Sequence, residues 1–97
     1  MAEITQQANQ WRIAGNVLMH DAQAILSQSA EFEMVGNIEI DFSAVTDVDT
    51  VALSLIMEWQ RRAAASNSQV TFTNLPVNLI SLAMLYGVTD FIAGAKH

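Results

Sequence analysis

The fold of this chain is decided by residues 38–59, which read IEIDFSAVTDVDTVALSLIMEW. Apolar and acidic side chains alternate over residues 38–42, and a period of two residues predicts a strand with one buried face. From Thr50 to about Ala65 the apolar residues recur at helical spacing, which predicts a helix with one apolar side. A strand that leads directly into a helix is typical of an α/β fold.

Three polar residues, Asp47, Asp49 and Thr50, mark the junction between this strand and this helix. An Asp or Thr at a helix start commonly accepts hydrogen bonds from the free amides, which stabilises the helix by about 1 kcal/mol. The positive end of the helix dipole would equally support a phosphate group or a contact with another protein. The junction therefore admits three roles: a helix cap, a phosphate acceptor, or the centre of a docking surface.

A β-hairpin is predicted before this unit. After a polar lead-in over residues 1–10, the apolar residues Trp11, Ile13 and Val17 alternate with polar or small neighbours. We expect Gly15 in the turn of the hairpin, because glycine suits tight turns. The chain should therefore open with two short strands.

The remaining elements complete one small domain. Asp21 can start a helix, Pro76 suits the first turn of another, and Gly87 can end that helix in a left-handed conformation. The predicted order is β-β-α-β-α-β-α, which gives one α/β domain over residues 1–97 with a mixed sheet and about three helices. The segments are a helix over residues 22–29, a connector over 31–36, a strand over 70–73 beside the strand at residue 38, a helix over 77–86, and a segment over 88–92 that fits either a final edge strand or a short helix.

The charge of the chain excludes several classes of partner. Four Lys or Arg residues stand against ten Asp or Glu residues, and the net charge of −6 opposes binding to nucleic acid or to anionic lipid headgroups. No apolar run approaches the roughly 20 residues that span a bilayer, so no direct membrane insertion is expected. The chain has no cysteine, and its N-terminus shows no signal-peptide pattern, which favours a cytoplasmic protein.

The sequence offers no constellation for catalysis. Asp41, Asp47 and Asp49 lack the glycine-bearing loop of an EF-hand, and His20 and His97 belong to no spaced ligand pair. Phosphate-binding loops of the GxxxxGK[ST] type and nucleophile motifs of the GxSxG type are missing as well. We therefore expect no enzyme activity, no metal, no cofactor and no small-molecule substrate.

Two predicted helices carry more apolar residues than one core face needs. Drawn at about 100° per residue, each divides into a core side and a mixed outer side. Clustered apolar surface usually serves as a contact site, and 52% of the chain is hydrophobic against 14% charged, so we expect a docking patch. The core sides hold Ala52, Leu55, Ile56, Trp59, Ala63, Leu79, Leu82, Ala83 and Tyr86, and the outer sides hold Thr50, Leu53, Ser54, Met57, Arg61, Val77, Ser81, Met84 and Leu85.

The strand-to-helix pattern resembles that of the STAS domain family, small α/β modules named after sulfate transporters and anti-anti-sigma factors. In that family a strand ends in Asp, a Ser follows two residues on, and a second Asp followed by Ser or Thr starts a helix. Asp41, Ser43, Asp49 and Thr50 are similar here, and the element order agrees over nearly the whole chain. The members most similar to this chain in the helix VDTVALSLIMEWQRRA and the segment NLPVNLISLAMLYGV are the cytoplasmic STAS subunits of Mla-type ABC transporters, which move phospholipids between the inner and outer membranes of Gram-negative bacteria.

The resemblance implies a non-catalytic accessory subunit that binds the ATPase subunit of such a transporter, stabilises or regulates its dimer, and stays peripheral to the inner membrane. The contact surface implied in this way contains Thr50 together with Asp47, Asp49, Leu53, Ser54, Met57 and Met84. The alternative within the family is an anti-anti-sigma factor that is switched by phosphorylation at Thr50. Many members carry Gly two residues after the hydroxyl residue, whereas Val51 and Ala52 follow Thr50 here. We expect their bulk to narrow access to the hydroxyl, which favours docking over the switch.

Overall fold

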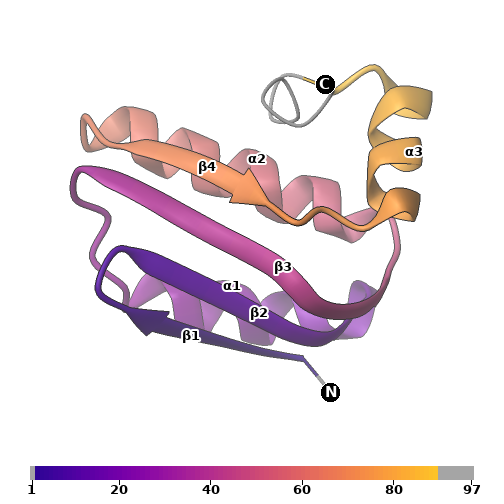
Figure 1. Cartoon of the computed structure of the whole chain (residues 1–97), viewed down its shortest axis with the longest axis horizontal. Helices are drawn as coiled ribbons and strands as arrows, with labels where there is room; N and C mark the ends of the chain where they lie inside the picture. The colour runs from indigo at the N-terminus through magenta and orange to yellow at the C-terminus, as the bar shows by residue number, and fades with distance from the viewer. Residues whose placement is uncertain (1, 90–97) are drawn as a thin grey trace.

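The computed structural model describes residues 2–89, and it consists of a four-stranded sheet with helices packed against it (Figure 1). The observed order, β-β-α-β-α-β-α, confirms the predicted one. Residues 88 and 89 belong to neither a strand nor a helix, and the rest of the predicted last segment lies outside the described residues. The elements are β1 (Glu3–Gln7), β2 (Gln10–Val17), the short 3-10 helix η1 (Met19–Asp21), α1 (Ala22–Ala30), β3 (Asn37–Val48), α2 (Val51–Ala65), β4 (Gln69–Thr73) and α3 (Val77–Tyr86).

The sheet is mixed, and its strands follow one another in sequence order. β1 pairs antiparallel with β2, whereas β3 pairs parallel with both β2 and β4. The parallel pairs follow from the connections, because α1 and α2 each return the chain to the end at which the previous strand began. Both helices lie behind the sheet in Figure 1, so none of the described helices covers the face turned toward the viewer.

The hairpin lies nearer the N-terminus than the sequence predicts. The residues interpreted as a polar lead-in form the edge strand β1, and the chain reverses at Ala8 and Asn9, where Ala8 has a φ of 55°. Gly15 has a φ of 90° but lies inside β2, at a point where the register against β3 shifts. Ile4 is buried between polar neighbours, a signal too weak to reveal a strand by its period. Gly15 therefore marks an irregularity in the ladder and not the turn.

The core lies between the sheet and the two helices behind it. Residues of β2 and β3 alternate between this side and the open side, as the burial pattern of each strand records. The predicted core side of α2 is confirmed, because every one of its residues is buried. The largest contributors to the core are Trp11, Ile13, Ile25, Ile40, Phe42, Leu55, Ile56, Trp59 and Leu79.

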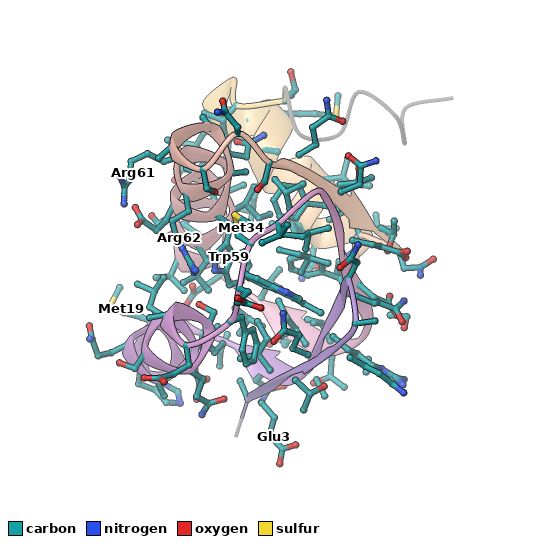
Figure 2. All side chains as sticks on the ribbon, turned by 90° about the vertical axis from the view of Figure 1, so that its left-hand side faces the viewer. Glu3, Met19, Met34, Trp59, Arg61 and Arg62 are labelled. Atoms are coloured by element: carbon teal, nitrogen blue, oxygen red, sulfur yellow. The ribbon has the colours of Figure 1, made fainter. Side chains whose placement is uncertain are left out.

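An aromatic cluster closes the end of the core that faces the viewer in Figure 2. The ring of Trp11 meets the edges of Phe32 and Trp59 at centroid distances of 5.1 and 6.1 Å. The indole nitrogen of Trp59 donates to the buried Ser29 hydroxyl at 3.0 Å. Arg62 donates to the carbonyl oxygens of Ser29 at 3.0 Å and Phe32 at 3.1 Å, and its guanidinium lies 5.7 Å from the Trp11 ring centre. One arginine of α2 therefore binds a carbonyl group in the last turn of α1 and another just beyond the helix.

Candidate docking surface

The residues that the sequence singles out lie at the opposite end of the sheet, where β2, β3 and β4 finish. Because these three strands are parallel, their carboxyl ends lie at the same end of the sheet. This end is the usual place for binding sites in α/β folds. At this end of the sheet, β2 is followed by η1, β3 by α2, and β4 by a three-residue connector to α3. Figure 1 shows α3 at the right, beside this carboxyl end of the sheet.

Asp49 is the residue that caps α2. Its carboxylate accepts a hydrogen bond from the amide of Val51 at 2.9 Å, and its carbonyl oxygen accepts one from the amide of Ala52 at 3.1 Å. The second carboxylate oxygen accepts from the amide of Met19 in the η1 segment, at 3.0 Å. The plain role that the sequence allowed for this junction is thus confirmed for Asp49. Its carboxylate therefore links the η1 segment to the start of α2.

Thr50 takes no part in that cap. Its backbone is already helical, with φ −61° and ψ −19°, and its side chain makes no capping hydrogen bond. Thr50 is exposed, whereas Ala52 is 1% exposed and points into the core. Ala52 therefore does not narrow access to Thr50 as expected, because its side chain is buried in the core, whereas Val51 is partly exposed. Thr50 therefore lies at the surface at the start of α2.

A groove of about 480 Å³ runs between the start of α2 and α3. Leucine and valine side chains supply its apolar part, and hydroxyl, amide and carboxylate groups supply the rest. The α3 residues that line it repeat at the spacing of one helix face, i, i+3, i+4 and i+7. The sequence reasoning did not assign Asn78 or Leu82 to the site, although this spacing was visible. The lining residues are Val48, Asp49, Thr50, Asn78, Ser81, Leu82 and Leu85.

The exposed side of α3 is unusually apolar. Val77 is 80% exposed, Leu85 76% and Met84 65%, and these outward positions confirm the prediction. Tyr86 was predicted in the core but is 60% exposed. The reason is that α3 stands at the end of the sheet, where it packs on α2 and fully buries only Leu79 and Ala83. Large isolated apolar groups are ordinary on a surface, but several on one short helix indicate a contact site.

The other predicted contact residues fall into three groups. Ser54 and Met57 are exposed, and they follow Thr50 at one and two turns along α2. Asp47 is exposed beside the groove, where its carboxylate accepts from the amide of Val48 at 2.9 Å. Leu53 is only 6% exposed, so its assignment to the outer side is wrong. Leu53 belongs to the buried core cluster, and α3 packs against α2. A helical wheel of α2 alone cannot show this packing.

Asp41 and Ser43 lie on the open face of the sheet, away from the groove. Asp41 alternates with the buried Ile40 and Phe42, so its carboxylate points to the side opposite the helices. The Ser43 amide donates to it at 2.8 Å and the Ser43 hydroxyl at 3.0 Å, and the Asn74 amide group donates at 2.9 Å. Partial burial by itself raises the pKa of Asp41, but these hydrogen bonds and the charge of Arg12 outweigh it and hold the pKa below its ordinary value.

The acidic residues weighed as metal ligands do not converge. Asp41 lies on the open face, Asp47 lies near the end of β3, and Asp49 caps α2. Within residues 2–89, no three His, Asp or Glu side chains come together in an arrangement that could hold a metal ion. The same part of the chain contains no helix that is both long enough and apolar enough to cross a membrane.

Comparison with known proteins identifies the family. A sequence profile described as "Mlab, STAS domain" matches residues 1–93. The chain belongs to the STAS domain family. No curated protein matches its sequence.

Solved structures share this STAS fold. The anti-sigma factor antagonist SpoIIAA in its unphosphorylated form is similar with a TM-score of 0.62 and 14% identity, over 88% of this chain and 83% of that one. A crystal structure of Mglu is similar with a TM-score of 0.59 and 18% identity over 77% of this chain, and Mglu in its native form with a TM-score of 0.53 and 15% identity over 75%. The chain spans 20% and 22% of the length of those two Mglu chains. At such identities the likeness concerns the fold alone.

Proposed function

We propose that this STAS domain is a non-catalytic accessory subunit, similar to MlaB, which binds the ATPase subunit of a Mla-type ABC transporter. The transporter would move phospholipids between the inner and outer membranes, and the domain would stabilise or regulate the MlaF-like ATPase dimer. In this proposal the domain works in the cytoplasm and meets the inner membrane only through the complex. It handles neither nucleic acid nor a small-molecule substrate.

The observation that carries the proposal is the groove between Thr50 and α3, with its rim of exposed apolar side chains. Thr50 is exposed and its side chain makes no capping bond, and Leu85, which lines the same groove, is 76% exposed. Protein interfaces typically combine an apolar centre with polar groups at the rim. Asp47 and Asp49 add negative charge at the rim. We therefore expect the ATPase to present an apolar surface with basic residues at its edge.

The surface can be tested by co-purification with the cognate ATPase subunit. Leu85→Asp and Thr50→Glu each place a charge inside the proposed interface, and each should weaken binding by about 2 kcal/mol or more, which is about 30-fold or more. Val35→Asp is the matched control, because Val35 is 66% exposed and borders the β1–β2 turn at the other end of the sheet. Binding of Leu85→Asp as tight as that of Val35→Asp would contradict the proposed surface.

A second candidate function is an anti-anti-sigma factor that is controlled by phosphorylation of Thr50. It is favoured by the exposed Thr50 at the start of α2 and by the fold shared with SpoIIAA. A phosphate there would add nearly two negative charges beside Asp49 and the groove, and would repel an acidic or apolar partner. Incubation with candidate serine kinases followed by intact mass measurement separates the two functions. One added phosphate, lost in Thr50→Val, would support the switch, and an unchanged mass would favour the docking subunit.

A further inference from the structure

α3 carries most of the exposed apolar surface at the groove, yet few core contacts fix its position. Only Leu79 and Ala83 of α3 are fully buried, whereas α2 buries six residues. The first residue of α3 follows Pro76, which has an extended backbone and provides no side-chain cap. The connector that joins α3 to β4, residues 74–76, is therefore placed to influence the position of the helix, beside the packing of Leu79 and Ala83.

The connector begins with a residue in an unusual conformation. The ladder between β3 and β4 ends where Asp41 pairs with Thr73. The next residue, Asn74, has a φ of 56°, the left-handed region that Asn tolerates better than most residues. Its side-chain amide donates to the Asp41 carboxylate at 2.9 Å. Asp41 thus extends the strand pairing by one side-chain bond, at the point where the chain turns toward α3.

The Asp41 carboxylate is itself fixed. The Ser43 amide donates to the same oxygen that Asn74 reaches, and the Ser43 hydroxyl donates to the other oxygen. A carboxylate that accepts several hydrogen bonds makes stronger bonds than a neutral acceptor does. The guanidinium of Arg12 favours its charged form as well. Asp41 and Ser43 belong to the pattern that resembles the STAS family, but they lie outside the docking surface. Together they form a fixed unit, in which Ser43 holds the Asp41 carboxylate as an acceptor for the connector.

We propose that Asp41 is a positioning residue, which sets the place of α3 against α2 by holding Asn74 and thereby shapes the groove. Ser43 orients the carboxylate, and Asn74 supplies both the left-handed turn and the donor. The effect on the position of α3 does not depend on the proposed function. The consequence for ATPase binding rests on the function proposed above.

Hydrogen–deuterium exchange of the full chain tests this role. Asn74→Gly keeps the left-handed turn and removes the donor, and Asn74→Asp sets two carboxylates against each other. The double variant Asp41→Asn/Asn74→Asp exchanges the partners, so that an amide again faces a carboxylate at unchanged net charge. Thr73→Val is the control, because it removes only the neighbouring bond from the Thr73 hydroxyl to Glu39, 2.9 Å long. Amides of α1 serve as the internal reference for changes in overall stability.

We expect α3 amides to exchange about tenfold faster in Asn74→Gly and Asn74→Asp, which is the change that loss of a hydrogen bond to a charged group implies. The double variant should return toward the wild-type rate, and Thr73→Val should stay near it. Unchanged α3 exchange in Asn74→Gly, or a double variant no slower than Asn74→Asp, would overturn the role of Asp41. Faster α3 exchange with unchanged ATPase binding would support that role and contradict the proposed docking function.

Discussion

The two ends of the sheet differ in how far their large apolar side chains are buried. At the end shown in Figure 2, Trp11 and Trp59 are fully buried, and Arg62 joins α1 to α2. At the other end Thr50 is exposed, and the short helix α3 leaves large apolar side chains such as Leu85 in solvent. Apolar groups left in water contribute nothing to folding. The difference shows that the aromatic end buries more of its large side chains, and it supports the proposal that a partner binds at the end near Thr50.

The largest effect on this contrast is expected from Trp59→Ala. The change removes a fully buried ring and leaves the Ser29 hydroxyl without its indole donor, so the free energy of unfolding should fall by about 3–5 kcal/mol. Urea denaturation followed by circular dichroism measures it. Leu85→Ala at the other end removes a side chain that is 76% exposed and should change stability by less than about 0.5 kcal/mol. Equal losses in the two variants would erase the contrast.

A smaller loss is expected when the arginine link is cut. Arg62→Met keeps much of the side-chain length but removes both donors to the carbonyl oxygens of Ser29 and Phe32, which should cost about 2 kcal/mol. Arg61→Met is the neighbouring control. Arg61 pairs only with Glu58 at the surface, where an ion pair contributes at most about 1 kcal/mol. The interpretation of Arg62 would be wrong if the two variants unfolded at the same urea concentration.

At the other end, the cap and the contact residue can be separated. Asp49→Ala removes the acceptor for the amides of Val51 and Met19 and should destabilise the domain by about 1–2 kcal/mol. Thr50→Ala should leave stability almost unchanged, because its side chain makes no capping bond. Thermal unfolding of the two variants compares them directly. A loss in Thr50→Ala as large as that in Asp49→Ala would show that the hydroxyl supports the helix.

The smallest expected effect is a pH dependence from Asp41. Its pKa in the folded chain lies below the ordinary value of 3.8, so its contribution to stability is present above about pH 4 and is lost as the pH falls through the folded-state pKa. The free energy of unfolding should therefore fall more steeply on acidification in the wild type than in Asp41→Asn. Denaturant titrations between neutral and acidic pH measure both slopes. Parallel curves would mean that Asp41 has the same pKa in the folded and unfolded chain.

Much of the fold could be predicted because it depends on local periodicity. The alternation before Phe42 and the apolar spacing from Ala52 to Ala63 identified β3 and α2 with their buried sides. Gly87, with a φ of 71°, ends α3 as the sequence predicts. The hairpin was misplaced, because a single buried Ile4 in a polar segment gives almost no periodic signal.

The candidate site was predicted in part, because its chemistry is local and its shape is not. Asp49 and Thr50 stand out at a helix start in the sequence, and both line the groove. Leu53 and Tyr86 were assigned to the wrong sides, since their burial depends on how α3 meets α2 at the end of the sheet. A helical wheel describes one helix and contains no information on that crossing.

The most direct test of the difference between the two ends is hydrogen–deuterium exchange of the wild-type domain, free and bound to its cognate ATPase subunit. Binding through the end near Thr50 predicts slower exchange on complex formation over residues 46–54 and in α3, with no change in residues 29–36 beside the aromatic cluster. Protection over residues 29–36 with unchanged exchange in α3 would contradict the assignment of the docking surface.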